Sequence, residues 1–230
     1  MKRFQNNNKA DLTARRGESE EQEMGNRAVI TTKENWKNGG VGIYLHWNGG
    51  RDSVEAFLKY CKLKGFRSPS SDSSYGMARL CQVISNCFGG GLSVGINILW
   101  KLDCDNFDNG VYIIDGWEIV DRAYFDGEEQ NEYDLNEMLW DIDQCQPKDE
   151  QLGDFLKAEE RAIEDIKVGD EVYFVDYNGK VQHQTVVGIG EDRFVNGTNV
   201  KGIPYMDLYE NDGSYTGNIN NYLIHGNYRV

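Results

Sequence analysis

At 230 residues the chain is longer than most single domains, and a hydrophobic content of 39% excludes a protein that is disordered throughout. A net charge of −14 argues against direct binding to the phosphate backbone of a nucleic acid. No apolar run is long enough to cross a membrane, and the first residues lack the apolar core of a signal peptide, so a cytoplasmic location is expected.

The chain opens with a segment that we expect to be a disordered tail. Residues 1–24 are polar and nearly free of apolar side chains, so burial cannot offset the entropy lost on ordering them. Strands are predicted over residues 27–32 and 41–47, with a loop through Gly39 and Gly40 between them.

Two helices are predicted next. The first is capped at Asp52 or Ser53 and ends near Gly65. Its apolar stripe is formed by Val54, Phe57, Leu58 and Cys61. The second covers residues 75–88, before three glycines at 89–91. Its apolar face is formed by Met77, Leu80, Cys81, Ile84 and Phe88.

The middle of the chain predicts a strand over 92–102 and a hairpin over 111–120 that turns at Asp115-Gly116. A helix over 134–144 precedes Pro147, which closes the domain. Residues 25–147 are therefore expected to form a mixed α/β domain with an antiparallel sheet.

The last part of the chain predicts a different architecture. Residues 148–165 are typical of a linking amphipathic helix, and residues 166–230 contain short β-rich runs broken by glycine-containing turns. This rhythm favours a small SH3-like β-barrel. The predicted fold class is α+β, with a mixed α/β domain followed by the barrel.

The negative charge is concentrated in one segment. Residues 101–165 contain twenty-one acids and five bases, a net charge of −16, whereas residues 25–100 carry +5. Aromatic residues are interleaved with these acids, which indicates a folded surface that could meet a basic partner, as a mimic of DNA phosphates does. The residues expected to form this acidic face are Asp115, Glu118, Asp121, Asp126, Glu128, Glu129 and Glu132.

Two alternative roles for the acids stay open. The face could simply be solvated, or it could bind a cation, since Asp103, Asp105, Asp108 and Gly110 begin like an EF-hand loop. That segment lacks the bidentate Glu of the twelfth position, so no metal site and no cofactor are predicted. The basic residues of the first helix, Arg51 to Arg67, could complement the acids within the molecule or between copies.

A Cys/His hydrolase is the catalytic alternative. His46, Trp47 and Asn48 follow a strand, where a functional side chain can be held, and Cys81 or Cys87 could supply a thiolate. The odd number of cysteines and the lack of a Cys-x-x-Cys spacing favour reduced thiols over disulfides or a zinc site. Because Cys81 is expected on an apolar helix face, binding is favoured over catalysis.

Residues 26–122, above all the stretches NRAVITT, GIYLHWNGG and GVYIIDGWEIV, resemble uncharacterised proteins carried by phages and mobile elements of Gram-positive and gut bacteria. The resemblance implies an accessory role for a mobile element, such as an anti-CRISPR or another inhibitor of host defence. The expected function is therefore inhibition of a bacterial defence nuclease, such as a CRISPR effector, through an acidic surface. A regulatory interaction module is the second non-catalytic hypothesis, and the target and the oligomeric state stay open.

Overall fold

The computed structural model describes residues 26–88, 93–161, 165–176, 179–195, 198–209, 215–218 and 228–229, and only the backbone at 187–195, 198–209, 215–218 and 228. The expected tail over residues 1–24 and the glycines at 89–91 lie outside the described residues. The chain divides into two compact units: unit 1 comprises residues 1–62 and 66–151, and unit 2 comprises residues 63–65 and 152–230.

Unit 1 is built on a five-stranded sheet in the order β3-β2-β1-β4-β5. The strands are β1 (Ala28–Thr32), β2 (Val41–Leu45), β3 (Val94–Ile98), β4 (Val111–Asp115) and β5 (Glu118–Ala123). β1 and β4 run parallel, and the other three pairs are antiparallel. The expectation of an antiparallel sheet is therefore wrong, because the chain returns after β3 to place β4 beside β1 in the buried centre.

In the described part of unit 1, the sheet is accompanied by α2 (Lys33–Asn38), α3 (Arg51–Leu63), α4 (Ser73–Asn86) and α5 (Leu135–Cys145). The apolar stripe predicted for α3 is confirmed, because its four residues are at most 1% exposed. The sequence pattern did not predict α2, although Thr32 caps its first turn by accepting from the Asn35 N–H and Gly39 ends it at φ 68°.

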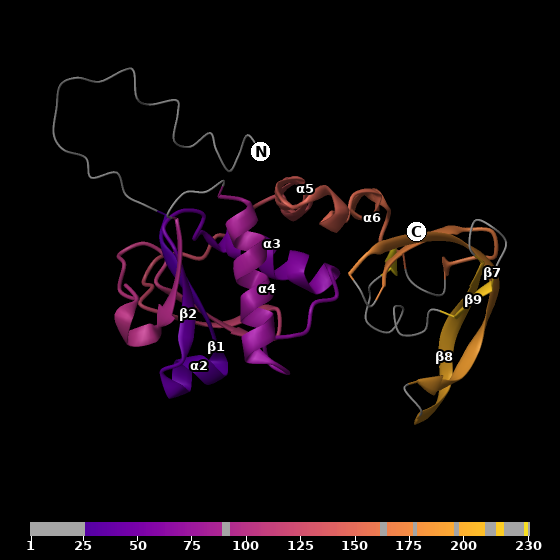
Figure 1. Ribbon diagram of the computed structural model, residues 1–230, viewed down its shortest axis with the longest axis horizontal. Coiled ribbons are helices and arrows are strands. Elements are labelled where there is room, and N and C mark those ends of the chain that lie inside the picture. Colours follow the sequence, from indigo (N-terminus) through magenta and orange to yellow (C-terminus); the bar gives the residue numbers. More distant parts are fainter. Residues whose placement is uncertain are drawn as a thin grey trace, which may run out of the picture. The chain divides into compact units, whose positions relative to one another are not determined.

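Both faces of the sheet are covered. In Figure 1, α3 and α4 lie on one side of β1 and β2. The other face carries a core of Val29, Leu99, Val111 and Ile113, against which Trp36, Tyr44, Leu102, Cys104 and Ala123 pack. Leu99 belongs to a short 3-10 helix, η1 (Leu99–Lys101), where the sequence predicted a continuous strand.

The β4–β5 hairpin turns one residue later than predicted. Asp115 pairs with Glu118, so the two turn residues are Gly116, at φ 63°, and Trp117. A register shift between Ile113 and Ile114 accompanies this turn. Asp115 therefore ends a strand, and its carboxylate is available to other parts of unit 1.

The linking helix expected over residues 148–165 is not continuous. A 3-10 turn, η2 (Lys148–Glu150), is followed by α6 (Asp154–Lys157), and Gly153 between them has φ 53°, which no helix residue adopts. Residues 162–164 lie outside the described part.

Unit 2 contains an antiparallel sheet in the order β10-β6-β7-β8-β9. The strands are β6 (Glu171–Val175), β7 (Val181–Val195), β8 (Thr198–Tyr209), β9 (Tyr215–Asn218) and β10 (Tyr228–Arg229). Among these described strands no pairing joins β9 to β10, so the sheet is open and a closed SH3-like barrel stays a prediction. Arg229 donates to the carbonyls of Leu156 and Ala158 and ties β10 to the start of the unit.

Replacing Gly110 by alanine tests how tightly the sheet packs on the segment after β5. Gly110 has φ 59°, and an added Cβ would collide with the carbonyl oxygens of Ala123 and Tyr124. We expect Gly110→Ala to lower the free energy of unfolding by more than about 2 kcal/mol in urea denaturation. Gly116→Ala is the control, since φ is also positive there but the nearest atom is 3.6 Å away, and about 1 kcal/mol is expected. Equal losses would contradict the clash.

Candidate interaction surface

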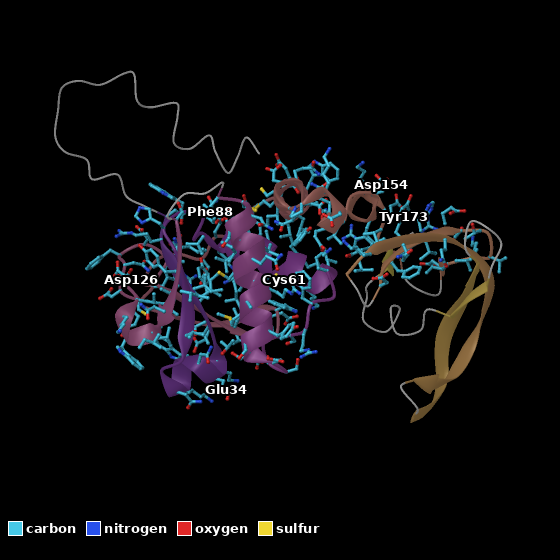
Figure 2. All side chains as sticks on the ribbon, viewed as in Figure 1. Glu34, Cys61, Phe88, Asp126, Asp154 and Tyr173 are labelled. Carbon is cyan, nitrogen blue, oxygen red and sulfur yellow. The ribbon has the colours of Figure 1, made fainter. Side chains whose placement is uncertain are left out.

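The seven predicted carboxylates lie on the hairpin and on the segment that follows it. Asp115 and Glu118 face each other across the turn, and Asp121 lies in β5. Asp126, Glu128, Glu129 and Glu132 belong to the connection between β5 and α5. Figure 2 shows Asp126 at the outer margin of unit 1 and Cys61 in its interior. The chain therefore brings these acids to neighbouring segments.

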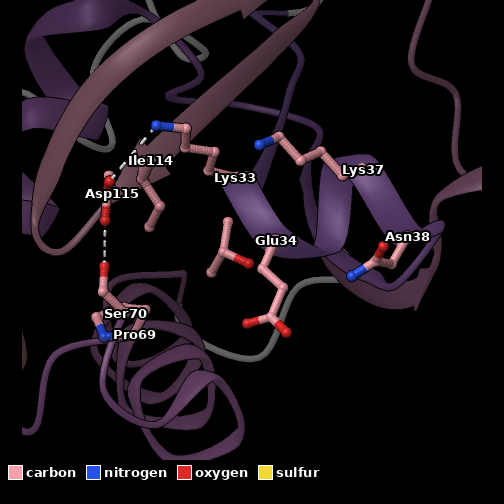
Figure 3. A pocket seen from close by; sticks show the side chains of 9 residues that line it. Lys33, Glu34, Lys37, Asn38, Pro69, Ser70, Ile114 and Asp115 are labelled. Atoms are coloured by element: carbon pink, nitrogen blue, oxygen red, sulfur yellow. Dashed lines mark hydrogen bonds and ion pairs between the residues drawn. The ribbon is translucent and has the colours of Figure 1, made fainter.

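Asp115 forms contacts with other residues of unit 1. Its carboxylate accepts a hydrogen bond of 2.5 Å from Ser70 Oγ and lies 3.9 Å from Lys33 Nζ. Figure 3 shows these two partners on opposite sides of Asp115, in a pocket of about 260 Å³ that Lys37 and Glu34 also line. The pocket mixes both signs of charge, so it favours no particular charged ligand.

Two further acids are paired with the basic helix. Glu118 lies 3.2 Å from Lys62 Nζ, and Glu129 lies 3.3 Å from Arg51 Nη1. The possibility that the basic residues of this helix complement the acids within the molecule is thus realised for Arg51 and Lys62. Of the seven carboxylates expected to form the acidic face, Asp115, Glu118 and Glu129 are therefore partly neutralised by lysine and arginine.

Among the bases that pair with these acids, Arg122 makes the closest contact, with Glu129. Its guanidinium lies between two rings, 3.7 Å from the centroid of Tyr112 and 3.9 Å from that of Phe125. Nη1 contacts both oxygens of Glu129 at 2.7 and 2.9 Å, and Nη2 donates to the Asn109 carbonyl. One side chain thus holds the acidic segment against the sheet through charge, stacking and a backbone contact.

A second contact fixes the far end of the same segment. The Tyr133 hydroxyl donates to the Glu55 carboxylate of α3. Burial and the Glu55 carboxylate raise the pKa of Tyr133 to about 12, so this hydroxyl remains a donor at neutral pH. The acidic segment is therefore anchored near both ends.

Four of the predicted carboxylates remain directed to solvent. Asp121, Asp126, Glu128 and Glu132 are exposed, and within the described residues none of them forms a salt bridge. Asp121 only accepts from the Arg122 N–H. The exposed carboxylates that form no salt bridge among the described residues thus lie mainly within residues 126–132.

The ring of His46 contacts only aromatic side chains among the described residues. His46 is exposed, its Nδ1 lies 3.4 Å from the Tyr44 hydroxyl, and its ring meets Trp47 edge to face at 5.0 Å. In the part of the chain that the structure describes, no cysteine lies within hydrogen-bonding distance of His46. Asn48 adopts φ 55°, which explains its place at the turn after β2.

Two cysteines, Cys61 and Cys104, favour the thiol over the thiolate, because the pKa of each is raised. Burial raises the pKa of Cys61, which is fully enclosed. Burial and the Asp103 carboxylate raise the pKa of Cys104. Cys81, expected in the core, is only half-buried and contacts Ser85 Oγ at 3.9 Å. Among the described residues, no hydrogen bond joins any of these three thiols to the base that a nucleophilic cysteine requires.

The loop that resembles an EF-hand has a structural purpose. The Asn106 side chain accepts from the N–H groups of Asp108 and Gly110, and Asp108 pairs with Arg27 at 2.6 Å. Among the described residues, no three His, Cys, Asp or Glu side chains are arranged to hold a metal ion.

An exposed aromatic groove lies beside this loop, and the sequence pattern did not predict it. It has a volume of about 510 Å³ and is lined by Trp36, Leu99, Trp100, Leu102, Asp103, Cys104, Asp105 and Tyr124. Trp100 is 72% exposed and Tyr124 is 57% exposed. A patch of large aromatic side chains that is open to solvent is typical of an interaction site, where Trp and Tyr are enriched.

No helix in the described part of the chain is long and apolar enough to span a membrane. Comparisons with family models, with curated proteins and with solved structures found no match to this chain.

Substitution of Arg122 tests whether this residue holds the acidic segment. Arg122→Gln removes the two contacts to Glu129 and the stacking on Tyr112 and Phe125, and the Arg122 side chain is only 12% exposed. We expect the free energy of unfolding to fall by about 2–4 kcal/mol in urea denaturation. Lys62→Gln is the control, because its pair with Glu118 is exposed, and a change below about 0.5 kcal/mol is expected. A loss of the same size in both variants would contradict the assigned role of Arg122.

Proposed function

We propose that this chain is a non-catalytic inhibitor encoded by a mobile element, which binds a basic nucleic-acid site on a bacterial defence nuclease such as a CRISPR effector. The nuclease and the inhibitor would meet in the cytoplasm of the bacterial host cell. The contact surface is the acidic segment around residues 126–132 and not the whole set of seven carboxylates.

The observation that carries this proposal is the anchoring of the segment. Arg122 and Arg51 hold Glu129, and Tyr133 contacts Glu55, so the chain between them is attached to the sheet and to α3. Asp126, Glu128 and Glu132 remain exposed on that anchored segment. Fixed carboxylates lose less entropy when they replace phosphates in a basic channel than carboxylates on a mobile tail do.

Internal pairing also argues for a local surface. Lysines and arginines pair with some of the acids, whereas Asp126, Glu128 and Glu132 form no salt bridge among the described residues. Acids that served solubility alone would not need this division. In unit 2, an SH3-like barrel would add contacts of its own, and this part of the proposal rests on the sequence pattern.

Neutralising the exposed group should abolish inhibition. The change is D126N with E128Q and E132Q, and the measurement is DNA cleavage by a purified CRISPR effector nuclease at increasing inhibitor concentration. We expect the wild-type chain to inhibit, and the variant to need at least about tenfold more protein, since each carboxylate contributes a charge pair. Inhibition by the wild-type chain should weaken between about 0.1 and 0.5 M salt.

The matched control is D149N with E150Q and E159Q. It changes the net charge by the same amount, within the acid-rich residues 101–165 but outside residues 126–132. This variant should inhibit like the wild-type chain. Equal loss in both variants would mean that total charge and not the anchored group is recognised. Absence of inhibition and of binding across a panel of basic defence nucleases would overturn the proposal.

The catalytic alternative has a separate test. His46→Ala and Cys81→Ser should each leave inhibition of cleavage unchanged, because the two side chains have different neighbours and do not form a pair. Inhibition measured with a preincubation series should also be independent of preincubation time, as expected for stoichiometric binding. Loss of activity in either variant with an unchanged unfolding midpoint would instead favour the hydrolase.

A further inference from the structure

The aromatic groove is assembled by three separate segments of unit 1. Trp36 comes from α2, Trp100 from η1, and Tyr124 from the residue after β5. Trp36 and Tyr124 meet edge to face with ring centroids 6.3 Å apart. Trp100 lies over Gly39, where an added Cβ would come within 3.3 Å of its ring. The residue that ends α2 thus leaves room for an indole that is largely open to solvent.

The charge beside these rings is negative. Asp103 and Asp105 line the groove, both are exposed, and among the described residues neither forms a salt bridge. The Arg27 guanidinium, whose pKa is raised by Asp108 and also by Asp103, forms its salt bridge with Asp108 at 2.6 Å. The groove therefore combines ring faces with two exposed carboxylates that form no salt bridge among the described residues.

The same chemistry recurs inside the molecule, where it holds an arginine. Arg122 is stacked between Tyr112 and Phe125 and paired with Glu129. The planar guanidinium suits such a place, since it stacks on rings, pairs with carboxylates in a fork and is weakly hydrated. An ammonium group shares the charge but is strongly hydrated and does not stack.

We propose that the groove of Trp36, Trp100 and Tyr124 binds an arginine side chain of a partner protein, with Asp103 and Asp105 accepting from its guanidinium. The occupant is an exposed arginine on a polypeptide, and burial of the Trp100 ring gives the contact its apolar component. The inference rests on the proposed function only for the identity of that partner, the basic nuclease. The groove would give a directional contact beside the acidic segment, which begins two residues after Tyr124.

The test uses capped pentapeptides with the sequence Gly-Ser-Arg-Ser-Gly and their lysine and citrulline versions, titrated into the full-length chain. The indole N–H resonances of the tryptophans are followed by NMR. We expect the resonances of Trp36 and Trp100 to shift and saturate with the arginine peptide, while that of Trp47 stays in place. The lysine peptide should bind more weakly, and the neutral citrulline peptide should not bind.

Variants separate the two parts of the site. D103N with D105N should weaken binding of the arginine peptide by at least about tenfold, and Trp100→Ala should abolish the shift of Trp36. The controls are D149N with E150Q, and Trp47→Ala, and an unfolding curve for each variant shows that it is folded. Equal binding of the citrulline peptide, or unchanged binding by the D103N and D105N variant, would overturn the proposal.

The outcome is distinguishable from that of the proposed function. The D126N, E128Q and E132Q variant should keep its affinity for the arginine peptide within about twofold, because those residues lie outside the groove lining. Peptide binding in a chain that inhibits no nuclease would uphold the groove and reject the proposed function. Inhibition by a chain that does not bind the peptide would do the reverse.

Discussion

The acidic segment of this protein depends on one cation whose side chain is only 12% exposed. Arg122 is enclosed by two aromatic rings and a carboxylate, and it reaches the Asn109 carbonyl across the end of the sheet. Without it, Glu129 would lose its closest partner, and the segment that carries Asp126 would leave the sheet. A net charge of −16 over residues 101–165 would then resist compaction by self-repulsion. The arginine thus allows carboxylates to be displayed on a folded segment.

Local patterns predicted the elements of unit 1 well where one signal dominated. The period of α3, with Val54, Phe57, Leu58 and Cys61 inward, and the helix predicted over residues 134–144, found as α5, follow from spacing and side-chain chemistry. The parallel pairing of β1 with β4 could not be predicted in this way, since strand direction depends on how distant segments pack. The missed helix α2 is six residues long, and its two cap signals outweigh a weak apolar pattern.

The predicted site fared less well for a related reason. A sequence shows which residues are acidic, but it does not show which ones have a partner: Glu118 and Glu129 find Lys62 and Arg51, more than fifty residues away. The sequence did not predict the groove, because its rings come from three segments and because Trp100 fitted the pattern of an apolar strand. Residue type was therefore a sound guide to chemistry, and a poor guide to which groups are left for another molecule.

The interior position of β4, between β1 and β5, has a consequence for how the chain acquires its structure. Val29 pairs with Val111, so the middle of the sheet joins parts of the chain that the ribosome makes far apart in time. Until β4 has emerged, β1 pairs with β2 on one side only. Its other edge leaves backbone N–H and C=O groups unpaired in a strand with apolar side chains. Unit 1 should consequently form late and all at once, and a nascent chain stalled before residue 111 would be a substrate for chaperones.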